Sequence, residues 1–555
     1  MKRLTLVLTL SIICLTSFSR QNISETQKVE AFIKIWGFLK YHHSVVGKGI
    51  IDWDSQFTTK IKDLSSLSSK QEINQYYITW IRSLGKNGEC KNCQTEKEST
   101  FRLNNDFQWL RDSAMFDKAL IDELANIKNN RNQKSNYYVS RVKGVGNTGF
   151  ENEKQYADSI YPSSEMRLLT LSRYWNIISY FFPYKYKTDQ PWNSVLVEMI
   201  PKFKNAADTT SYHLAIKELT AKIDDSHAQF STGNTNKYFG FKWVPFNFKI
   251  IDDKAVVIGF HNEALSKKDD VRIGDVFTKI DNLTISEILK KNSRFIGASN
   301  EAVKRRGAYY ILFNGDKDKL ETEFERDGIT TKKTLSRYGY DKINYKWNAL
   351  NGTDTSKILR GNIGYVNMGN LEQKQVDLVL KSLQNTKAII FDVRNYPKGT
   401  FYRIAQFLNN DVKPFVKFTI PDLKNPGNYT YTDPMYCGKI NPDYYKGKVV
   451  LLCNEQTQSH AEFTLMALKT APNVTVVGSQ TSGADGNVSE IILPGNFKTM
   501  ITGIGVYYPD GTETQRIGIV PDVVVKPTIK GIRAGKDEVL EKVIFVLKSM
   551  DLFEV

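Results

Sequence analysis

Ser459 occupies a position at which enzymes often place a nucleophile. It lies within NEQTQSHAEF, residues 454–463, between the apolar run KVVLLC and the helical pattern FTLMALKTA. A serine hydroxyl is a weak nucleophile until a neighbouring base removes its proton. Serine is also a preferred residue at the start of a helix, so Ser459 by itself could be only a helix cap. The choice between these two roles depends on finding a base elsewhere in the chain.

His227 is the best candidate for that base. The sequence has six histidines, at positions 42, 43, 213, 227, 261 and 460. Three of them lie in helical patterns that favour packing, one leads into a loop, and His460 should point away from its neighbour Ser459. His227 lies in KIDDSHAQFST beside Asp225 and Ser226, and an imidazole with a reference pKa near ~6.5 can take and return a proton. The sequence contains no His-Glu-x-x-His cluster, so we expect neither a catalytic metal nor another cofactor.

An internal repeat supplies the element that leads into His227. The segment FIKIWGFLKYHHSVVGKGIIDW, residues 32–53, matches LSRYWNIISYFFPYKYKTDQPW, residues 171–192, at a constant offset of 139. Both copies carry apolar residues at helical spacing and continue into a second helical pattern. Ser24 and Gln27 form a capping-box pattern at the start of the first copy. We therefore expect two similar helical units, of which only the second leads into Ser226 and His227.

The rest of the chain changes pattern twice. Residues near 240–340 contain short strand patterns such as FNFKII and KAVVIGF, followed by a turn with an apolar-Gly-Asp step. From about residue 355 strand and helix patterns alternate, which predicts an α/β layered domain. The segment GKDEVLEKVIFVLKSM near the C-terminus predicts a closing helix.

Length and charge limit the classes of function. A chain of 555 residues is too long for one hydrophobic core. Apolar residues make up 41% and charged residues 25%, which is ordinary for a soluble globular protein. The formal net charge is +16, but Lys and Arg are scattered along the chain. This distribution favours a solvated surface over a nucleic-acid site.

The first residues predict export. MKRLTLVLTLSIICLTSFS has a basic start, an apolar stretch and small residues, which is typical of a secretory signal peptide cut after Ser19. Cys14 leaves a lipoprotein signal as an alternative, although the bulky Ile13 before it disfavours lipidation. No later run is long and apolar enough to span a bilayer. In an exported protein, Cys90 and Cys93 of GECKNCQ favour a local disulfide over free thiols or a zinc site.

Several motifs around Ser459 occur together in an order that resembles one family. Ser459-His460-Ala461-Glu462 fits the pattern Ser-x-Ala-Glu. An Asp–Arg–Gly pattern upstream and a Gly-x-x-Pro-Asp signature downstream accompany it, at Asp392, Arg394 and Gly399 and at Gly518, Pro521 and Asp522. Over roughly residues 165–555 the chain resembles the C-terminal processing proteases, serine peptidases of family S41. The resemblance implies an α/β multidomain fold: a crotonase-like (ClpP/crotonase) α/β protease domain, a PDZ-like β-rich domain and, beside them, the duplicated helical units.

The family has two catalytic designs, and the chain is similar to only one of them. In the first design Ser is paired with Lys in a Thr-x-Gly-Lys-Gly motif, but residues 481–486 read TSGADG and contain no Lys. The second, that of the tricorn core protease, uses a Ser-His-Ser-Glu tetrad whose Ser-His pair matches Ser226 and His227. The resemblance places the glutamate of the tetrad at Gln515, with Glu513 and Asp225 as candidate support.

The resemblance also implies a role for each of these residues. Ser459 would be the nucleophile and His227 the general base, and Ser226 and Gln515 would hold the imidazole in one tautomer. The backbone N–H groups of His460 and Gly399 would form the oxyanion hole.

The resulting prediction is an exported serine endopeptidase or C-terminal processing peptidase, located in a bacterial periplasm, at the cell surface or in the medium. We expect a polypeptide substrate, no nucleic-acid partner and no integral membrane segment after signal removal, and the oligomeric state stays open. The predicted domains are a signal peptide (1–19), a first helical unit (20–140), a second helical unit (141–238), the PDZ-like domain (239–345) and the catalytic domain (346–555). The missing Lys and Gln515 motivate an alternative, a catalytically inactive S41-like protein that binds peptides or small ligands. A third hypothesis is a scaffold whose helical units bind a partner protein.

Overall fold

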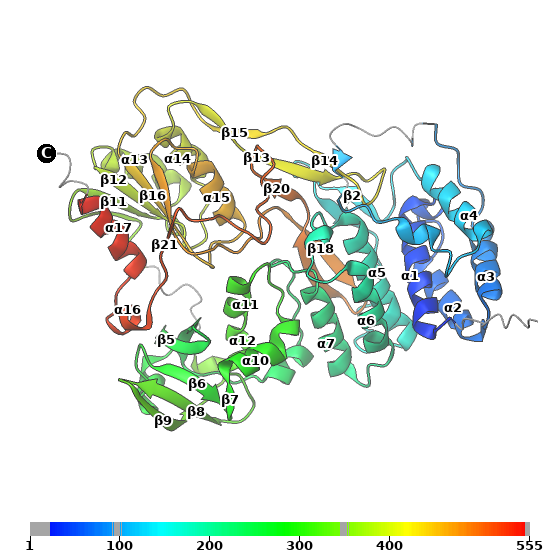
Figure 1. Cartoon of the computed structure of the whole chain (residues 1–555), viewed down its shortest axis with the longest axis horizontal. Helices are drawn as coiled ribbons and strands as arrows, with labels where there is room; N and C mark the ends of the chain where they lie inside the picture. Colours follow the sequence, from blue (N-terminus) through cyan, green and yellow to red (C-terminus); the bar gives the residue numbers. More distant parts are fainter. Residues whose placement is uncertain are drawn as a thin grey trace, which may run out of the picture.

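The computed structural model describes residues 23–549 apart from 92, 94–99, 102, 344–351 and 353. The chain is an α/β multidomain protein, as predicted. Figure 1 shows a helical part at the right, a β-rich part at the bottom and a C-terminal α/β part at the upper left. The predicted signal peptide, with Cys14, lies outside the described residues, so export stays a prediction. No helix in the described ranges combines the length and the apolar character that a membrane crossing requires.

The helical part consists of two copies of one arrangement. In the first copy α1, a 3-10 turn, α2 and α3 span Glu25–His42, Val46–Lys48, Trp53–Asp63 and Lys70–Ser83. In the second copy α5, a 3-10 turn, α6 and α7 span Ser164–Phe181, Lys185–Lys187, Trp192–Lys204 and Thr209–Ala221. The first helix starts at residue 25 in one copy and 164 in the other, and the other three elements keep the same shift of 139. The repeat therefore covers the whole three-helix unit, and Ser24 and Gln27 form the predicted capping box.

The same pair of hydrogen bonds stabilises each copy. The indole of Trp36 donates to the carbonyl of Trp53 at 3.0 Å, and the indole of Trp53 donates back to the carbonyl of Trp36 at 3.2 Å. In the second copy Trp175 and Trp192 make the equivalent two bonds at 2.9 and 3.0 Å. Each reciprocal pair satisfies two buried indole donors at the junction of two helices. The tryptophans that revealed the repeat in the sequence are therefore its structural centre.

The two copies pack against each other through equivalent positions. Gly37 of α1 lies against Asn176 of α5, and an added Cβ at Gly37 would come within 1.9 Å of the Asn176 side chain. Tyr41 and Tyr180 are the next equivalent pair, with ring centroids 5.5 Å apart. Contacts between identical positions are the signature of an isologous, two-fold interface. The helical part is thus a pseudo-dimer within one chain.

Shorter elements connect the copies. The predicted disulfide between Cys90 and Cys93 is present. It is followed by α4 (Lys118–Asn129) and by the hairpin of β2 (Val139–Arg141) and β3 (Thr148–Phe150).

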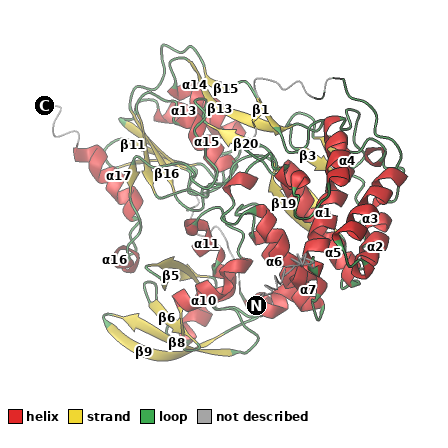
Figure 2. Ribbon diagram, turned by 45° about the vertical axis from the view of Figure 1, so that its right-hand side comes forward, coloured by secondary structure: helices red, strands yellow, loops and turns green. Residues whose placement is uncertain are grey.

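The β-rich part is an antiparallel sheet with short helices packed against it. The sheet order is β4-β5-β6-β8-β9, spanning Phe246–Ile251, Lys254–Phe260, Val276–Ile280, Lys319–Arg326 and Ile329–Ser336, with β7 (Leu283–Thr284) beside β6. The short helices are α8 (Gly233–Phe239), α9 (Glu263–Lys268), α10 (Ile285–Asn292), α11 (Glu301–Gly307) and α12 (Tyr309–Leu312). Phe246, Phe277 and Phe313 pack face to face or edge to face in its core. In Figures 1 and 2, α11 lies on the side of this domain that faces the rest of the molecule.

The C-terminal part is a sheet covered on both faces. Its order is β10-β11-β12-β16-β17-β21, spanning Ser356–Leu359, Ile363–Asn367, Ala388–Asp392, Lys448–Cys453, Val474–Gly478 and Val523–Val524, and all neighbours except β10 and β11 are parallel. One face packs on α13 (Val376–Leu383), α14 (Phe401–Leu408) and α15 (His460–Leu468). The other packs on α17 (Glu538–Ser549), which follows α16 (Ile529–Arg533). Strands buried on both faces explain the unbroken apolar runs of the sequence.

Two further strand groups join the C-terminal part to the helices. A sheet of order β1-β14-β13-β15, with β20 beside β13, contains Thr100–Phe101, Tyr429–Tyr431, Val412–Pro421, Met435–Gly438 and Gly505–Tyr507. The hairpin of β18 (Val488–Leu493) and β19 (Phe497–Thr502) buries Ile491, Leu493 and Ile501 in the helical core. Residues 488–502 thus belong to the predicted catalytic domain in sequence and to the helical part in packing.

Candidate active site

Ser459 sits on a strained turn at the end of a buried strand. It follows β16, precedes α15 and has φ 56° and ψ −122°. A positive φ is uncommon for a residue with a side chain, and such strain persists only where the surroundings enforce it. Thr457 provides part of this constraint, because its hydroxyl donates to the carbonyl of Val393 at 2.8 Å, just after β12. The turn presents Ser459 at the carboxyl edge of the parallel strands.

Glu462 joins this turn to the loop of residues 481–486. Its buried carboxylate accepts hydrogen bonds from the backbone N–H groups of Ser459, Gly483 and Ala484 at 3.2, 2.7 and 3.1 Å, and from the hydroxyl of Thr481 at 2.5 Å. Burial raises the pKa of Glu462, although these donors oppose the shift. The N–H of Ser459 also lies 3.0 Å from the carbonyl of Ala484. The fourth residue of the Ser-x-Ala-Glu motif is therefore a brace for the turn.

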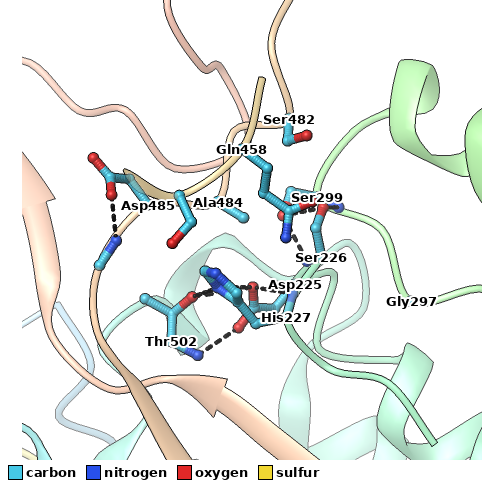
Figure 3. Close-up of polar contacts among 12 residues, drawn as sticks. Asp225, Ser226, His227, Gly297, Ser299, Gln458, Ser482, Ala484, Asp485 and Thr502 are labelled. Atoms are coloured by element: carbon cyan, nitrogen blue, oxygen red, sulfur yellow. Dashed lines mark hydrogen bonds and ion pairs between the residues drawn. The ribbon is translucent and has the colours of Figure 1, made fainter. Parts of the chain in front are cut away.

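His227 is held by Thr502 and Asp225. Its Nδ1 lies 2.8 Å from the hydroxyl of Thr502 and 3.4 Å from Oδ1 of Asp225 (Figure 3). Asp225 is fully buried and accepts from the N–H of Thr502 at 2.7 Å and from its hydroxyl at 3.1 Å. Burial opposes the charge on Asp225, but the hydrogen bonds from His227 and Thr502 outweigh it and keep its pKa below the ordinary value.

This arrangement selects one tautomer of the imidazole. An ionised carboxylate only accepts hydrogen bonds, so the Thr502 hydroxyl must donate to Asp225. Its lone pairs then face Nδ1 of His227, which must carry the proton. Nε2 is left as the basic nitrogen, which is the form that a general base requires.

The two residues expected to hold the imidazole make other contacts. Ser226 exchanges hydrogen bonds with Ser299: its hydroxyl lies 3.0 Å from that of Ser299, and each N–H donates to the partner hydroxyl at 2.9 Å. Gln515 is buried, and its amide nitrogen and oxygen have no partner among the described residues. Glu513 binds Tyr186 and Lys187. Of the candidate supports, only Asp225 lies at the imidazole. Its carboxylate also accepts hydrogen bonds from the backbone N–H and the hydroxyl of Thr502, the last residue of β19.

Gly399, one of the two residues predicted to supply oxyanion donors, lies beside the side chain of the other, His460. Gly399 has φ 72°, and a Cβ built on it would be 4.0 Å from Nε2 of His460. Gln373 fixes this loop by donating to the carbonyls of Gly399 and, at 3.2 Å, Lys398. The N–H of His460 is at the first turn of α15, where the helix dipole favours negative charge.

One loop of the β-rich part connects the His227 segment to the Ser459 segment. Ser299 binds Ser226, and Asn300 donates to the carbonyls of Thr481 and Ser482 at 2.9 and 3.1 Å. Arg306 of α11 donates to the side chain of Gln458 at 2.6 Å, and Gln458 immediately precedes Ser459. Figure 3 shows the imidazole of His227 below Ala484 and Gln458. The Ser226 and Ser459 segments are thus both connected to the loop of residues 481–486 and its neighbours.

Asp485 occupies the loop in which the other catalytic design carries Lys. It is 3% exposed, one carboxylate oxygen accepts from the N–H of Gly486 at 2.7 Å, and Oδ2 has no partner among the described residues. Burial, with the nearby carboxylate of Glu462, raises its pKa well above the ordinary value. The loop therefore contains an acid whose ionisation is disfavoured, and no cation.

The first helical copy has the same turn as the second but carries no histidine on it. At the equivalent turn Gly85 has φ 93° where Asp224 has φ 51°. Two residues later Asn87 takes the position of Ser226, and it accepts from the N–H of Ser44 at 2.8 Å and donates to the carbonyl of Asn130 at 2.7 Å. The residue equivalent to His227 is glycine. The turn was retained in both copies, but only the second uses it to carry an imidazole.

Comparisons with known proteins agree with the motifs. Residues 362–525 match the model of peptidase family S41. A carboxy-terminal-processing protease of Bartonella bacilliformis is 24% identical over 231 residues, which cover 38% of this chain and 51% of that protein. The chain thus spans about half the length of this curated relative.

Two solved structures share the fold. Mature CPAF has a TM-score of 0.55 at 14% identity, and its complex with lactacystin has 0.54 at 13% identity. Each of the two matches covers 70% of this chain and 98% of the CPAF chain. Residues 362–525, which carry the strained turn of Ser459 and its brace Glu462, are thus the part of the chain that matches peptidase family S41.

Proposed function

We propose that the protein is an exported serine endopeptidase of the C-terminal processing type, with Ser459 as nucleophile and His227 as general base. The matched family and the named relative support a peptidase. One observation within the chain carries the proposal furthest. His227 is fixed as the Nδ1–H tautomer by Thr502 and Asp225, while Ser459 sits on a strained turn joined to the same 482–486 segment.

The proposed reaction follows the acyl-enzyme route. The hydroxyl of Ser459 attacks the carbonyl carbon of the scissile peptide bond, and Nε2 of His227 takes its proton. The N–H groups of His460 and Gly399 stabilise the oxyanion. His227 then gives the proton to the leaving amine, and a water molecule, deprotonated by the same nitrogen, releases the acyl group. Asp225 stabilises the imidazolium that exists between these steps.

The β-rich part and the disulfide support two finer aspects. A six-stranded antiparallel sheet with short helices is compatible with a PDZ-like domain that grips an extended peptide by strand addition, beside a crotonase-like catalytic domain. The Cys90–Cys93 disulfide is compatible with an oxidising compartment such as the periplasm or cell surface. Removal of the signal peptide predicts a mature protein that begins at Arg20, which N-terminal sequencing of the exported protein tests.

Labelling with a fluorophosphonate probe tests the central claim. The probe forms a bond between its phosphorus and Oγ of an activated serine, the phosphorus–fluorine bond breaks and fluoride leaves, and the hydroxyl proton passes to the base. We expect a single adduct on Ser459 by intact mass and peptide mapping, absent in Ser459→Ala and strongly slowed in His227→Ala. Folded wild-type protein that gives no adduct, with or without unfolded polypeptide present, overturns the proposal.

Gln515 favours the alternative of an inactive binding protein. The resemblance matches Gln515 to the carboxylate of the tetrad, and its amide has no partner among the described residues. In that case the wild type would show no adduct but would still bind peptides, which fluorescence anisotropy with labelled peptides measures.

A further inference from the structure

A four-residue segment of the β-rich part contacts both segments from which the candidate active site is built. These residues, 297–300, have the sequence GASN and lie between α10 and α11, and we call them the clasp. Gly297, Ala298 and Ser299 are buried although they form a loop. Loops usually run over the surface, because their backbone polar groups need partners. A buried loop therefore indicates specific contacts.

One side of the clasp contacts the segment that carries the candidate base. Ser226 and Ser299 share three hydrogen bonds of 2.9 to 3.0 Å between their hydroxyl and N–H groups (Figure 3). Gly297 approaches the backbone closely, and an added Cβ would stand 2.3 Å from the carbonyl oxygen of Ala228. Ser226 and Ala228 are the two sequence neighbours of His227. The clasp therefore contacts the chain on both sides of the imidazole-bearing residue.

The other side of the clasp binds the loop that supports the candidate nucleophile. The side-chain amide of Asn300 donates to the carbonyls of Thr481 and Ser482 at 2.9 and 3.1 Å. The N–H of Ser459 donates to the carbonyl of Ala484 in the same loop at 3.0 Å. The clasp is thus one step away from the base segment and one loop away from the nucleophile.

The first helical copy lacks this contact between domains. Asn87 occupies the position equivalent to Ser226, and its side chain binds Ser44 and Asn130, which both belong to the helical part. The equivalent turn is therefore bound within its own domain in the copy without a histidine. In the copy with the histidine it is bound to the β-rich part.

We propose that the clasp positions the catalytic groups relative to each other. Gly297 and Ser299 fix the backbone that carries His227. Asn300 fixes the loop to which Ser459 is bound. The clasp acts through these segments, so its members are positioning residues. A displacement of about 1 Å can slow a reaction by about 10²-fold, which is why such contacts affect the rate. This inference rests on the proposed peptidase function and concerns the same site.

The rate of phosphonylation of Ser459 by the fluorophosphonate probe tests the contact with the base segment. Gly297→Ala should displace the clasp from Ala228 and slow labelling by about 10²-fold, because the added Cβ meets backbone and not a flexible side chain. Gly259→Ala is the matched control in the same part of the chain. A Cβ at Gly259 meets nothing within 4 Å, so its labelling rate should not change.

A double-mutant cycle tests whether Ser226 and Ser299 act as one unit. Ser226→Ala and Ser299→Ala should each slow labelling about tenfold, the rate equivalent of one hydrogen bond. The double variant should be at most about twofold slower than either single variant, because the second change removes nothing further. Ser266→Ala is the control for lost stability. Ser266 is fully buried in the β-rich part and donates to the carbonyls of Pro245 and Asn262, and its variant should label at the wild-type rate.

Asn300→Asp tests the contact with the loop that supports Ser459. Aspartate keeps the cap of α11, because its side-chain oxygen still accepts from the N–H of Val303, but it removes the amide donors. We expect labelling to slow by at least about tenfold. The retained cap separates the role of the clasp from the folding of α11.

The outcomes are distinguishable. If wild type is labelled and the folded Gly297→Ala, Ser299→Ala and Asn300→Asp variants are labelled equally fast, the positioning role is overturned and the peptidase proposal stands. Equal losses of rate in the control variants, or losses that simply add in the double variant, also overturn it. No labelling of wild type overturns both proposals. Thermal unfolding of each variant establishes that it is folded, and Ser299→Ala, which only removes an atom, keeps the test valid if Gly297→Ala does not fold.

Discussion

Oδ1 of Asp225 lies 3.4 Å from Nδ1 of His227, and the hydroxyl of Thr502 bridges the two at 3.1 and 2.8 Å. The bridge makes the orientation of the imidazole depend on a residue 275 positions away in the sequence. It also gives this chain a carboxylate for the imidazolium although the tetrad position holds Gln515. In the proposed mechanism, the charge that the tetrad glutamate would provide comes from Asp225, the residue next to Ser226.

Substitution of Asp225 tests this assignment. Asp225→Asn should lower the rate of Ser459 phosphonylation and any peptide hydrolysis by roughly 10²–10⁴-fold, the scale known for the aspartate of Ser-His-Asp peptidases. Thr502→Val should cost roughly tenfold, the equivalent of one hydrogen bond of about 1.4 kcal/mol, and Thr502→Ser should restore most of it. Equal rates for Asp225→Asn and wild type would show that the carboxylate does not act on His227.

Arg306 should control the reactivity of Ser459 from the neighbouring domain. Its guanidinium contacts Gln458, the carbonyl of Glu455 and, at 3.1 Å, the hydroxyl of Ser482. Arg306→Lys loses the forked geometry, and we expect the labelling rate to fall about tenfold. The adjacent Arg305 pairs with Asp253 and Glu301 at the surface, so Arg305→Lys is the matched control and should leave the rate unchanged. A fall in labelling rate of similar size in both variants would show that the cause is a general loosening of the β-rich part and not the loss of the Arg306 contacts.

The Gly37–Asn176 contact predicts a compensating pair. A methyl group at Gly37 would come within 1.9 Å of the Asn176 side chain, so Gly37→Ala should lower the free energy of unfolding by about 1–3 kcal/mol. Combined with Asn176→Ala, the loss should be largely recovered, because alanine favours helix over glycine once the space is free. Chemical denaturation of both single variants and the double variant measures the coupling between the two residues. Losses in the free energy of unfolding that simply add would show that the two residues do not interact.

Asp485 predicts a pH-dependent stability. Its pKa is raised in the folded state, so the unfolded chain releases the proton first, and folding stability falls as pH rises above the ordinary carboxyl range. Asp485→Asn keeps the acceptor for Gly486 and cannot ionise. The free energy of unfolding of Asp485→Asn should exceed that of wild type only slightly near pH 4. The difference should grow by up to about 1.4 kcal/mol per pH unit until the pH reaches the pKa of Asp485 in the folded state. Denaturation curves at pH 4, 6 and 8 measure this, and a constant difference would mean that Asp485 ionises normally.

Patterns close together in the sequence predicted most of the fold. The capping box at Ser24, the strands β4, β5 and β16, the closing helix and the Cys90–Cys93 disulfide all depend on neighbours within one element, and all are present. The repeat was predicted as well, because its tryptophans keep their spacing.

The support of His227 could not be predicted, because it depends on contacts between distant segments. Thr502 ends a hairpin that packs among the helices, and no local pattern marks it as a partner of Asp225. Ser299 of the β-rich part likewise forms hydrogen bonds with Ser226, so Ser226 binds Ser299 and not the imidazole of His227. A resemblance transfers the types of residue in a site, but it does not say which hydrogen bond each one makes.

The isologous contact of α1 and α5 has a consequence for how the site is maintained. Two separate copies of such a helical unit would associate only above their dissociation constant, and the unit that carries His227 would lose its partner unit on dilution. Here the polypeptide links both halves, so each experiences the other at an effective concentration in the millimolar range or above. The unit that carries His227 therefore has its partner at every protein concentration.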